Sequence, residues 1–190
     1  MSGGKQKSLP TWAELGRQGW VHRGTKRPAF ALEPGPGQES VWDYPRPPCL
    51  VADSREVVVA AFGVEIARTT AALRVLETSH PPTFYLPRAD VDMRHLERVR
   101  GRSSRCEWKG EATYFDVVVG QDRLPRVAWS YEQPFDDATA LAGHLAFYAS
   151  SVDATVGGER VRPQPGGFYG GWITAELVGP FKGEPGSEGW

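Results

Sequence analysis

The sequence predicts a mainly β protein: a small antiparallel domain with one or two short helices and an N-terminal extension. The chain has 22 glycines and 16 prolines among 190 residues, which suits a sheet protein with many turns better than a helical bundle. Short runs of β-branched residues lie between turn residues, as they do on either side of Phe62-Gly63. Seven tryptophans indicate heavy aromatic packing or aromatic walls around a pocket. A chain of this length suits one domain with a substantial core.

Residues 1–38 are predicted to be an extension, and residues 39–190 to be the single domain. Thr11 and Glu14 have the spacing of a capping box, which predicts a short helix within the extension. Its aromatic and apolar side chains would dock on the domain or on a partner chain. The proline-rich stretch at 40–48 is expected to be stiff and extended, because a residue before proline avoids helical geometry.

The next part of the chain predicts a β-hairpin and then a helix. The hairpin spans 57–67, with its turn at Phe62-Gly63. Residues 69–79 fit either a helix or a strand, and they lead into an extended segment at 80–87. Residues 90–100 are expected to form a helix capped by Asp90.

The last part of the chain predicts more strands and an irregular tail. The elements expected are strands at 112–119, 126–131 and 144–150, one helical turn at 136–142, and a glycine-aromatic tail at 163–172 that covers a sheet edge.

Several motifs resemble one known family. They include residues 39–48 (ESVWDYPRPP), 72–87 (ALRVLETSHPPTFYLP), 106–110 (CEWKG), 143–148 (GHLAFY) and 170–174 (GGWIT). Their order and spacing resemble the family known as domain of unknown function 427, sometimes labelled a nucleotidyltransferase. The resemblance covers roughly residues 39–190 and implies a β-tent fold, similar to the Mss4-like group.

Two properties of that wider group find no counterpart in this sequence. Relatives often hold zinc with two cysteine pairs, but Cys49 and Cys106 are the only cysteines, and no C-x-x-C occurs. A nucleotidyltransferase would need a phosphate-binding loop or paired aspartates for magnesium. No such loop is present, and Asp90-Val91-Asp92 is expected to cap a helix.

The densest group of chemically active residues is the run from Arg105 to Asp116. If the run is a strand, Cys106 and Trp108 face the core and Lys109 faces solvent. Gly110 offers an alternative, since a bulge there would aim Lys109 into an aromatic pocket. Such a lysine either loses its proton near neutrality or binds an anionic group. Cys106 is a candidate nucleophile, with a buried hydrophobic role as the alternative.

Glu77, His80 and Tyr85 form a second candidate group beside a proline-stiffened strand. A carboxylate, an imidazole and a phenol make a plausible acid–base set, and together with Lys109 they are the predicted catalytic residues. The alternative is that Glu77 pairs with Arg74 and His80 caps a turn. The predicted ligand-binding residues are Arg74, Tyr114, Trp129 and Trp172.

These residues predict a domain that acts on a small molecule by metal-free acid–base or electrostatic catalysis, without a cofactor. The alternatives are a non-catalytic metabolite-binding module, a nucleotidyltransferase as the family label suggests, and a protein-interaction domain. The net charge of −1 gives no electrostatic indication that the chain binds nucleic acid or an anionic membrane. No apolar run approaches membrane-spanning length, so a cytoplasmic protein is expected, with a homodimer left open.

Overall fold

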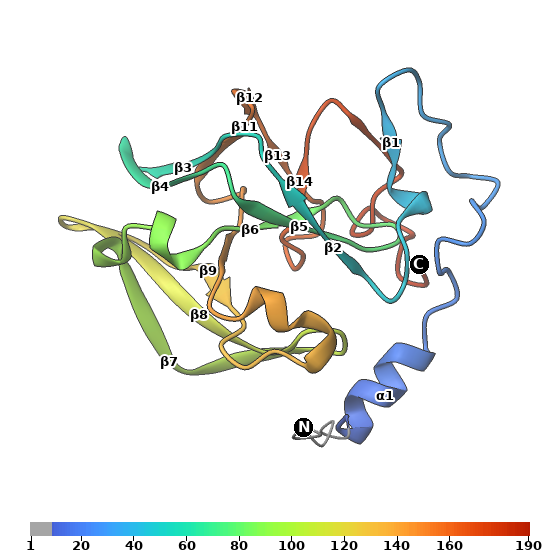
Figure 1. Ribbon diagram of the computed structural model, residues 1–190, viewed down its shortest axis with the longest axis horizontal. Coiled ribbons are helices and arrows are strands. Elements are labelled where there is room, and N and C mark those ends of the chain that lie inside the picture. Colours follow the sequence, from blue (N-terminus) through green and yellow to red (C-terminus); the bar gives the residue numbers. More distant parts are fainter. Residues whose placement is uncertain (1–8) are drawn as a thin grey trace, which may run out of the picture.

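The computed structural model describes residues 9–190 and is mainly β, as predicted. Its strands form small sheets that are antiparallel apart from one short parallel pair (Figure 1). Residues 1–8 of the predicted extension lie outside the described residues. No helix in the described part is both long and apolar enough to cross a membrane.

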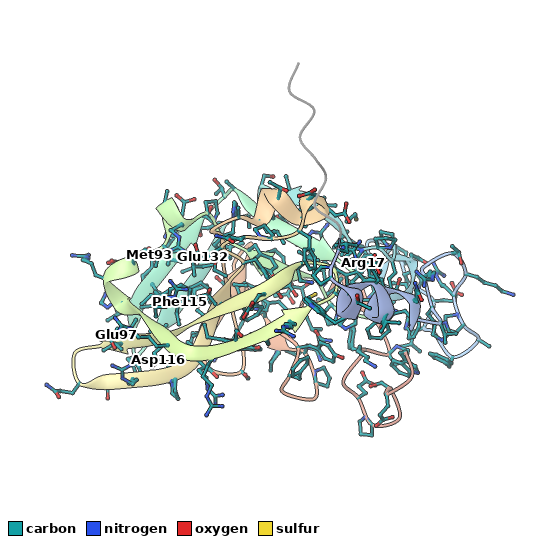
Figure 2. The ribbon with its side chains drawn as sticks, turned by 90° about the horizontal axis from the view of Figure 1, so that it is seen from below. Arg17, Met93, Glu97, Phe115, Asp116 and Glu132 are labelled. Carbon is teal, nitrogen blue, oxygen red and sulfur yellow. The ribbon has the colours of Figure 1, made fainter. Side chains whose placement is uncertain are left out.

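The largest sheet is a four-stranded antiparallel ribbon in the order β10-β9-β8-β7. Its strands are β7 (Leu96–Cys106), β8 (Gly110–Val119), β9 (Asp122–Ser130) and β10 (Leu145–Phe147). β7, β8 and β9 follow one another through tight hairpins, so the long ribbon is built from local pairings (Figure 1). Figure 2 shows its two ends, with Glu97 and Asp116 near one end and Arg17 at the other.

Two further sheets face this ribbon. One has the order β12-β11-β3-β4, and the other has the order β2-β5-β6. Their strands are β2 (Cys49–Asp53), β3 (Val57–Ala61), β4 (Val64–Thr69), β5 (Ala72–Leu76), β6 (Thr83–Tyr85), β11 (Asp153–Val156) and β12 (Glu159–Arg160).

Four short strands near the chain ends complete the fold. β13 (Arg162–Pro163) pairs with β14 (Trp172–Ile173), and β1 (Glu39–Ser40) runs parallel to β15 (Leu177–Val178). The C-terminal segment is thereby tied to the start of the predicted domain.

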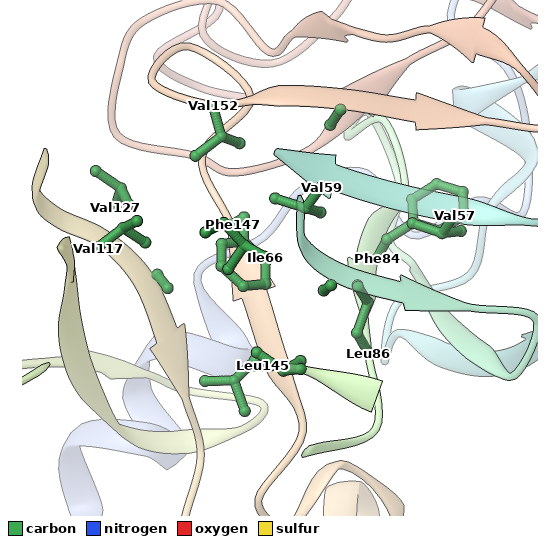
Figure 3. Close-up of a cluster of buried hydrophobic side chains, with 14 of the residues drawn as sticks. Val57, Val59, Ile66, Phe84, Leu86, Val117, Val127, Leu145, Phe147 and Val152 are labelled. Carbon is green, nitrogen blue, oxygen red and sulfur yellow. The ribbon is translucent and has the colours of Figure 1, made fainter. Parts of the chain in front are cut away.

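The main hydrophobic core lies where the sheets face one another (Figure 3). Alternate residues of β3, Val57 and Val59, are fully buried, as is Leu145 of β10. The two-residue period of a strand sends these side chains to one face and leaves the intervening ones toward solvent. The core therefore holds the ribbon against the other sheets and fixes the positions of the strand ends.

The predicted hairpin at 57–67 is confirmed as β3 and β4, and the ambiguous segment 69–79 contains strand β5. The tight turn at 136–142 is confirmed as a 3-10 helix at Asp136–Leu141. The strands expected at 112–119, 126–131 and 144–150 correspond to β8, β9 and β10 with shifted ends.

The predicted helix at 90–100 is wrong. Two 3-10 turns, Arg88–Asp90 and Met93–His95, lead directly into β7. Within residues 9–190, β7 is an edge strand that pairs only with β8, so most of its side chains are solvent-exposed and its sequence resembles that of a surface helix. Asp92, rather than Asp90, accepts a hydrogen bond from the backbone of a turn residue.

Two N-terminal expectations also need correction. Helix α1 (Thr11–Gln18) exists, but Pro10 is its N-cap residue and Thr11 lies inside the helix, so no capping box forms. Residues 40–48 are not wholly extended, since Val41–Asp43 form a 3-10 turn capped by the Ser40 hydroxyl.

Candidate functional site

The run that begins at Arg105 is a hairpin rather than one continuous strand. Cys106 ends β7 and pairs with Gly110, which begins β8. Between them Lys109 donates its backbone N–H to the Cys106 carbonyl at 3.3 Å, and its own carbonyl accepts from Phe135 at 3.1 Å. Gly110 has φ +104°, a left-handed conformation that side-chain-bearing residues rarely adopt. This turn places Lys109 in a cavity between the sheets.

A second tight turn, from Glu77 to His80, joins β5 to β6. The His80 N–H donates to the Glu77 carbonyl at 3.0 Å. Ser79 has φ 69°, and its N–H donates to the Val41 carbonyl at 2.9 Å. The Thr78 hydroxyl donates to the Tyr44 carbonyl at 2.6 Å. The segment before β2 therefore stabilises this strained turn, which presents Glu77 and His80 to the same cavity.

The cavity has a volume of about 180 Å³ and brings both turns together. Glu77, His80, Tyr85 and Lys109, the four predicted catalytic residues, all line it, and Cys106 lines it as well. Its aromatic walls include Tyr114 and Trp129, two of the predicted ligand-binding residues. Polar groups on an otherwise aromatic surface are typical of small-molecule sites.

The acidic and basic groups of the cavity influence one another. Burial tends to raise the pKa of Glu77, but His80, Lys109 and Arg46 outweigh it and hold that pKa below its usual value. Burial tends to lower the pKa of Lys109, but Cys106, Tyr85 and Glu77 raise it above the usual value. Glu77 is therefore a carboxylate and Lys109 an ammonium at neutral pH. The lysine is an electrostatic group in this state and not a base.

His80 is a neutral imidazole, and its hydrogen bond to Thr78 determines which ring nitrogen carries the proton. Burial lowers its pKa, so that the uncharged ring is the form present at neutral pH. Nδ1 lies 3.0 Å from the Thr78 carbonyl oxygen, which can only accept a hydrogen bond. Nδ1 therefore carries the proton, and Nε2 carries a lone pair that can accept one. The Tyr169 ring packs edge-on against the imidazole at 4.8 Å between centroids.

The phenols of the cavity are hydrogen-bond donors. Burial raises the pKa of Tyr85 to about 12, and the Trp129 indole N–H donates to the Tyr85 hydroxyl oxygen at 3.2 Å. Burial also raises the pKa of Tyr131 well above its usual value. Both hydroxyls keep their protons at neutral pH and can donate them to an oxygen of a bound molecule.

A family model described as a domain of unknown function, DUF427, matches residues 49–158. The chain belongs to the DUF427 family. No curated protein matches the chain. The matched DUF427 region contains Glu77, His80, Tyr85, Cys106 and Lys109, so the four predicted catalytic residues all lie inside it.

Two predicted ligand-binding residues of this DUF427 chain lie elsewhere. Arg74 of β5 does not line the cavity, and its guanidinium lies 3.3 Å from Asp53 and 3.5 Å from Glu39. It therefore does not pair with Glu77. Trp172 is fully buried in the main core, where its ring stacks on Phe84 and its N–H donates to the Phe147 carbonyl.

The partner of Glu77 is Arg46, which the sequence did not single out. The Arg46 guanidinium donates to Glu77 Oε1 at 3.2 Å and to the Thr78 carbonyl at 2.8 Å. It also stacks over the Trp20 ring at 4.1 Å. The only sequence signal for Arg46 is its place in the proline-rich motif at 39–48.

Residues outside the matched DUF427 region complete the cavity wall. Trp20 lines it from the extension, and its indole N–H donates to Glu107 Oε1 at 2.6 Å. Arg17 of α1 donates to the Glu107 carbonyl at 2.8 Å, beside the end of the ribbon (Figure 2). Gln164 and Tyr169 contribute from the C-terminal part. Trp20 of the extension therefore docks on the domain at the cavity, and Trp12 packs against Phe135, whereas Leu15 is exposed and does not dock.

No group of three or more His, Cys, Asp and Glu side chains within residues 9–190 is arranged to hold a metal ion.

Proposed function

We propose that the cavity binds a small molecule with a carbonyl or carboxylate oxygen and catalyses a proton transfer on it. The observation that carries this proposal is the convergence of a neutral imidazole, an ammonium and a carboxylate on one aromatic cavity. A site that holds unprotonated and protonated groups side by side at neutral pH is typical of acid–base catalysis.

Each group has a distinct part in the proposal. The Lys109 ammonium binds and polarises the substrate oxygen, and the Tyr85 hydroxyl is available as a second donor. His80 Nε2 accepts a proton from the carbon or oxygen next to that group. Glu77 favours the imidazolium that then forms, because a nearby carboxylate stabilises positive charge.

The volume of the cavity supports a small substrate. At about 180 Å³ it is smaller than the roughly 300–1,000 Å³ of sites for drug-sized ligands. A nucleoside triphosphate exceeds this space, which disfavours the nucleotidyl transfer that the family label suggests. The β-tent class, a cytoplasmic location and a homodimer stay predictions.

A metabolite-binding module is the second candidate, favoured by the ion pair that Glu77 already makes with Arg46. A satisfied ion pair can serve to shape a binding cavity without taking part in proton transfer.

Ligand-observed NMR with a library of small carboxylates and carbonyl compounds tests the first step. Binding should be lost in Lys109→Met and retained in Lys26→Met, a matched change of an exposed lysine in the extension. Equal binding by both variants would contradict the assigned role of Lys109.

The second step separates catalysis from binding. A bound ligand with an acidic C–H should exchange that proton for deuterium in D₂O when wild-type protein is present. His80→Asn keeps a side-chain N–H for the Thr78 carbonyl but lacks Nε2, so it should bind the ligand and exchange nothing. Binding without exchange by the wild-type protein would favour the binding module.

A further inference from the structure

The edge strand β7 of the largest sheet carries a concentration of positive charge (Figure 1). Its arginines are all exposed: Arg98, Arg100, Arg102 and Arg105. Most other arginines in the described part of the chain pair with a carboxylate, whereas these form no ion pair within residues 9–190. Residues 1–8 contain no Asp or Glu. No ion pair therefore offsets the charge of β7.

The same arginines line a groove of about 1100 Å³, which the first residues of β8 also line. Trp12 and Phe135 add aromatic surface to it, with their ring centroids 5.9 Å apart. The Arg105 guanidinium lies over the Trp12 ring at 5.5 Å from its centroid. The groove exceeds the roughly 300–1,000 Å³ of pockets for small ligands, so it suits a segment of a larger molecule.

The carboxylates of the groove leave most of this positive charge in place. Glu97 and Glu132 line the groove, and each pairs with an arginine that lies outside it. Among the described residues, Glu111 is the groove carboxylate without an ion pair, and it is opposite Arg105 in the strand register. The groove therefore has an excess of positive charge and complements a negatively charged partner.

The backbone of β7 also offers unpaired hydrogen-bonding groups. Within the described residues no strand pairs with its outer edge, and residues 99–102 form a bulge with no paired residue on β8. Unpaired strand backbone presents both N–H donors and C=O acceptors, which the backbone of an added peptide can satisfy. A phosphodiester backbone has acceptors only and leaves the C=O groups unpaired. The backbone therefore favours an acidic peptide over nucleic acid as the partner.

We propose that this groove binds an extended acidic segment of a partner protein. The carboxylates of the segment pair with the arginines of β7, and its backbone bonds to the unpaired edge of that strand. A second copy of this chain is a poor occupant, because two β7 strands side by side would bring like charges together. The interaction is an addition to the proton transfer proposed for the cavity, and neither depends on the other.

Fluorescence anisotropy with a labelled Glu-Thr repeat peptide of the length of β7 tests the proposal. The peptide should bind the wild-type protein, a neutral Gln-Thr repeat should not, and added salt should weaken binding. Arg100→Gln combined with Arg102→Gln should weaken binding by ~10-fold, because two charge-assisted contacts are lost. Arg160→Gln combined with Arg162→Gln is the matched control, since it removes the same charge from exposed positions outside the groove and should bind like wild type.

Several results would overturn the proposal. If folded wild-type protein does not bind the Glu-Thr peptide, the arginines serve only to keep an open sheet edge from aggregating. Equal loss of binding in the two double variants, both shown to be folded by circular dichroism, would indicate a response to net charge alone. Tighter binding of an oligothymidylate at the same salt concentration would assign the groove to nucleic acid. A dimer in light scattering that Arg100→Gln with Arg102→Gln dissociates would assign it to a second copy.

Discussion

Arg46 should be the most sensitive single residue for the stability of the site. Its side chain is fully buried, and it contacts Glu77, the Thr78 carbonyl and the His22 carbonyl. Arg46→Met keeps an apolar side chain in the same space and removes all three hydrogen bonds. The substitution leaves the buried Glu77 carboxylate without its hydrogen-bonded cation, and Lys109 is then the positive side chain that still faces it.

The magnitude follows from the loss of this buried ion pair. Breaking a buried ion pair by removing one partner typically costs about 3–5 kcal/mol, and we expect the free energy of unfolding of Arg46→Met to fall by that amount at pH 7. Domains of ordinary stability have about 5–15 kcal/mol in total, so the variant should lose a large share of its stability and unfold at a much lower urea concentration.

Urea denaturation followed by circular dichroism measures this loss. Arg68→Met is the matched control, because Arg68 pairs with Glu56 and Glu65 and is about half exposed. Exposed pairs contribute about 0–1 kcal/mol, so the control should change stability little.

A double-mutant cycle with Glu77→Gln tests the reasoning directly. Glutamine has no charge to leave unpaired, so Arg46→Met should cost less in the Glu77→Gln background, by about 1–3 kcal/mol. A loss below about 1 kcal/mol for Arg46→Met alone would refute the ion-pair argument, as would strict additivity of the two changes.

Three further outcomes are expected. The pKa of Glu77 is lowered in the folded state, so stability should fall as the pH drops from about 4.3, the usual value in an unfolded chain, through the folded value. In acid denaturation series, Glu77→Gln should remove that contribution, and an unchanged pH profile would contradict the charge assignment. A Cβ on Gly170 would lie 2.0 Å from Trp129 Cη2, so Gly170→Ala should displace that ring and alter near-UV circular dichroism, whereas Gly189→Ala, in open space, should not. Trp20→Ala should destabilise the protein by about 1–2 kcal/mol and speed hydrogen exchange in residues 9–24, because it removes a hydrogen bond and a cation–π contact. Unchanged exchange would show that Trp20 does not hold the extension in place.

The local pattern of the sequence was sufficient for much of the fold. The hairpin around Phe62-Gly63 could be predicted because both its strands and its turn are contiguous. The helix expected at 90–100 failed because an edge strand exposes most of its side chains, and exposure removes the two-residue alternation on which a strand prediction depends. The segment 69–79 could not be assigned because its apolar residues fit both periods.

The candidate site was predictable only in part. The ionisable side chains were enough to predict four catalytic residues. The structure brings all four to one cavity: Glu77, His80, Tyr85 and Lys109. Arg74 was grouped with Glu77 on sequence spacing alone, although Arg74 lies beside Asp53 away from the cavity and Glu77 follows β5 in the turn that lines it.

Turn residues, strand runs and motif order were enough to identify a mainly β protein of the DUF427 family, because all three can be read from neighbouring residues. The three-dimensional packing was needed to show that Arg46 rather than Arg74 meets Glu77, and that Trp20 and Tyr169 line the cavity. These contacts join residues from both ends of the chain to its middle, and they depend on how the sheets pack. No spacing in the sequence encodes that packing directly.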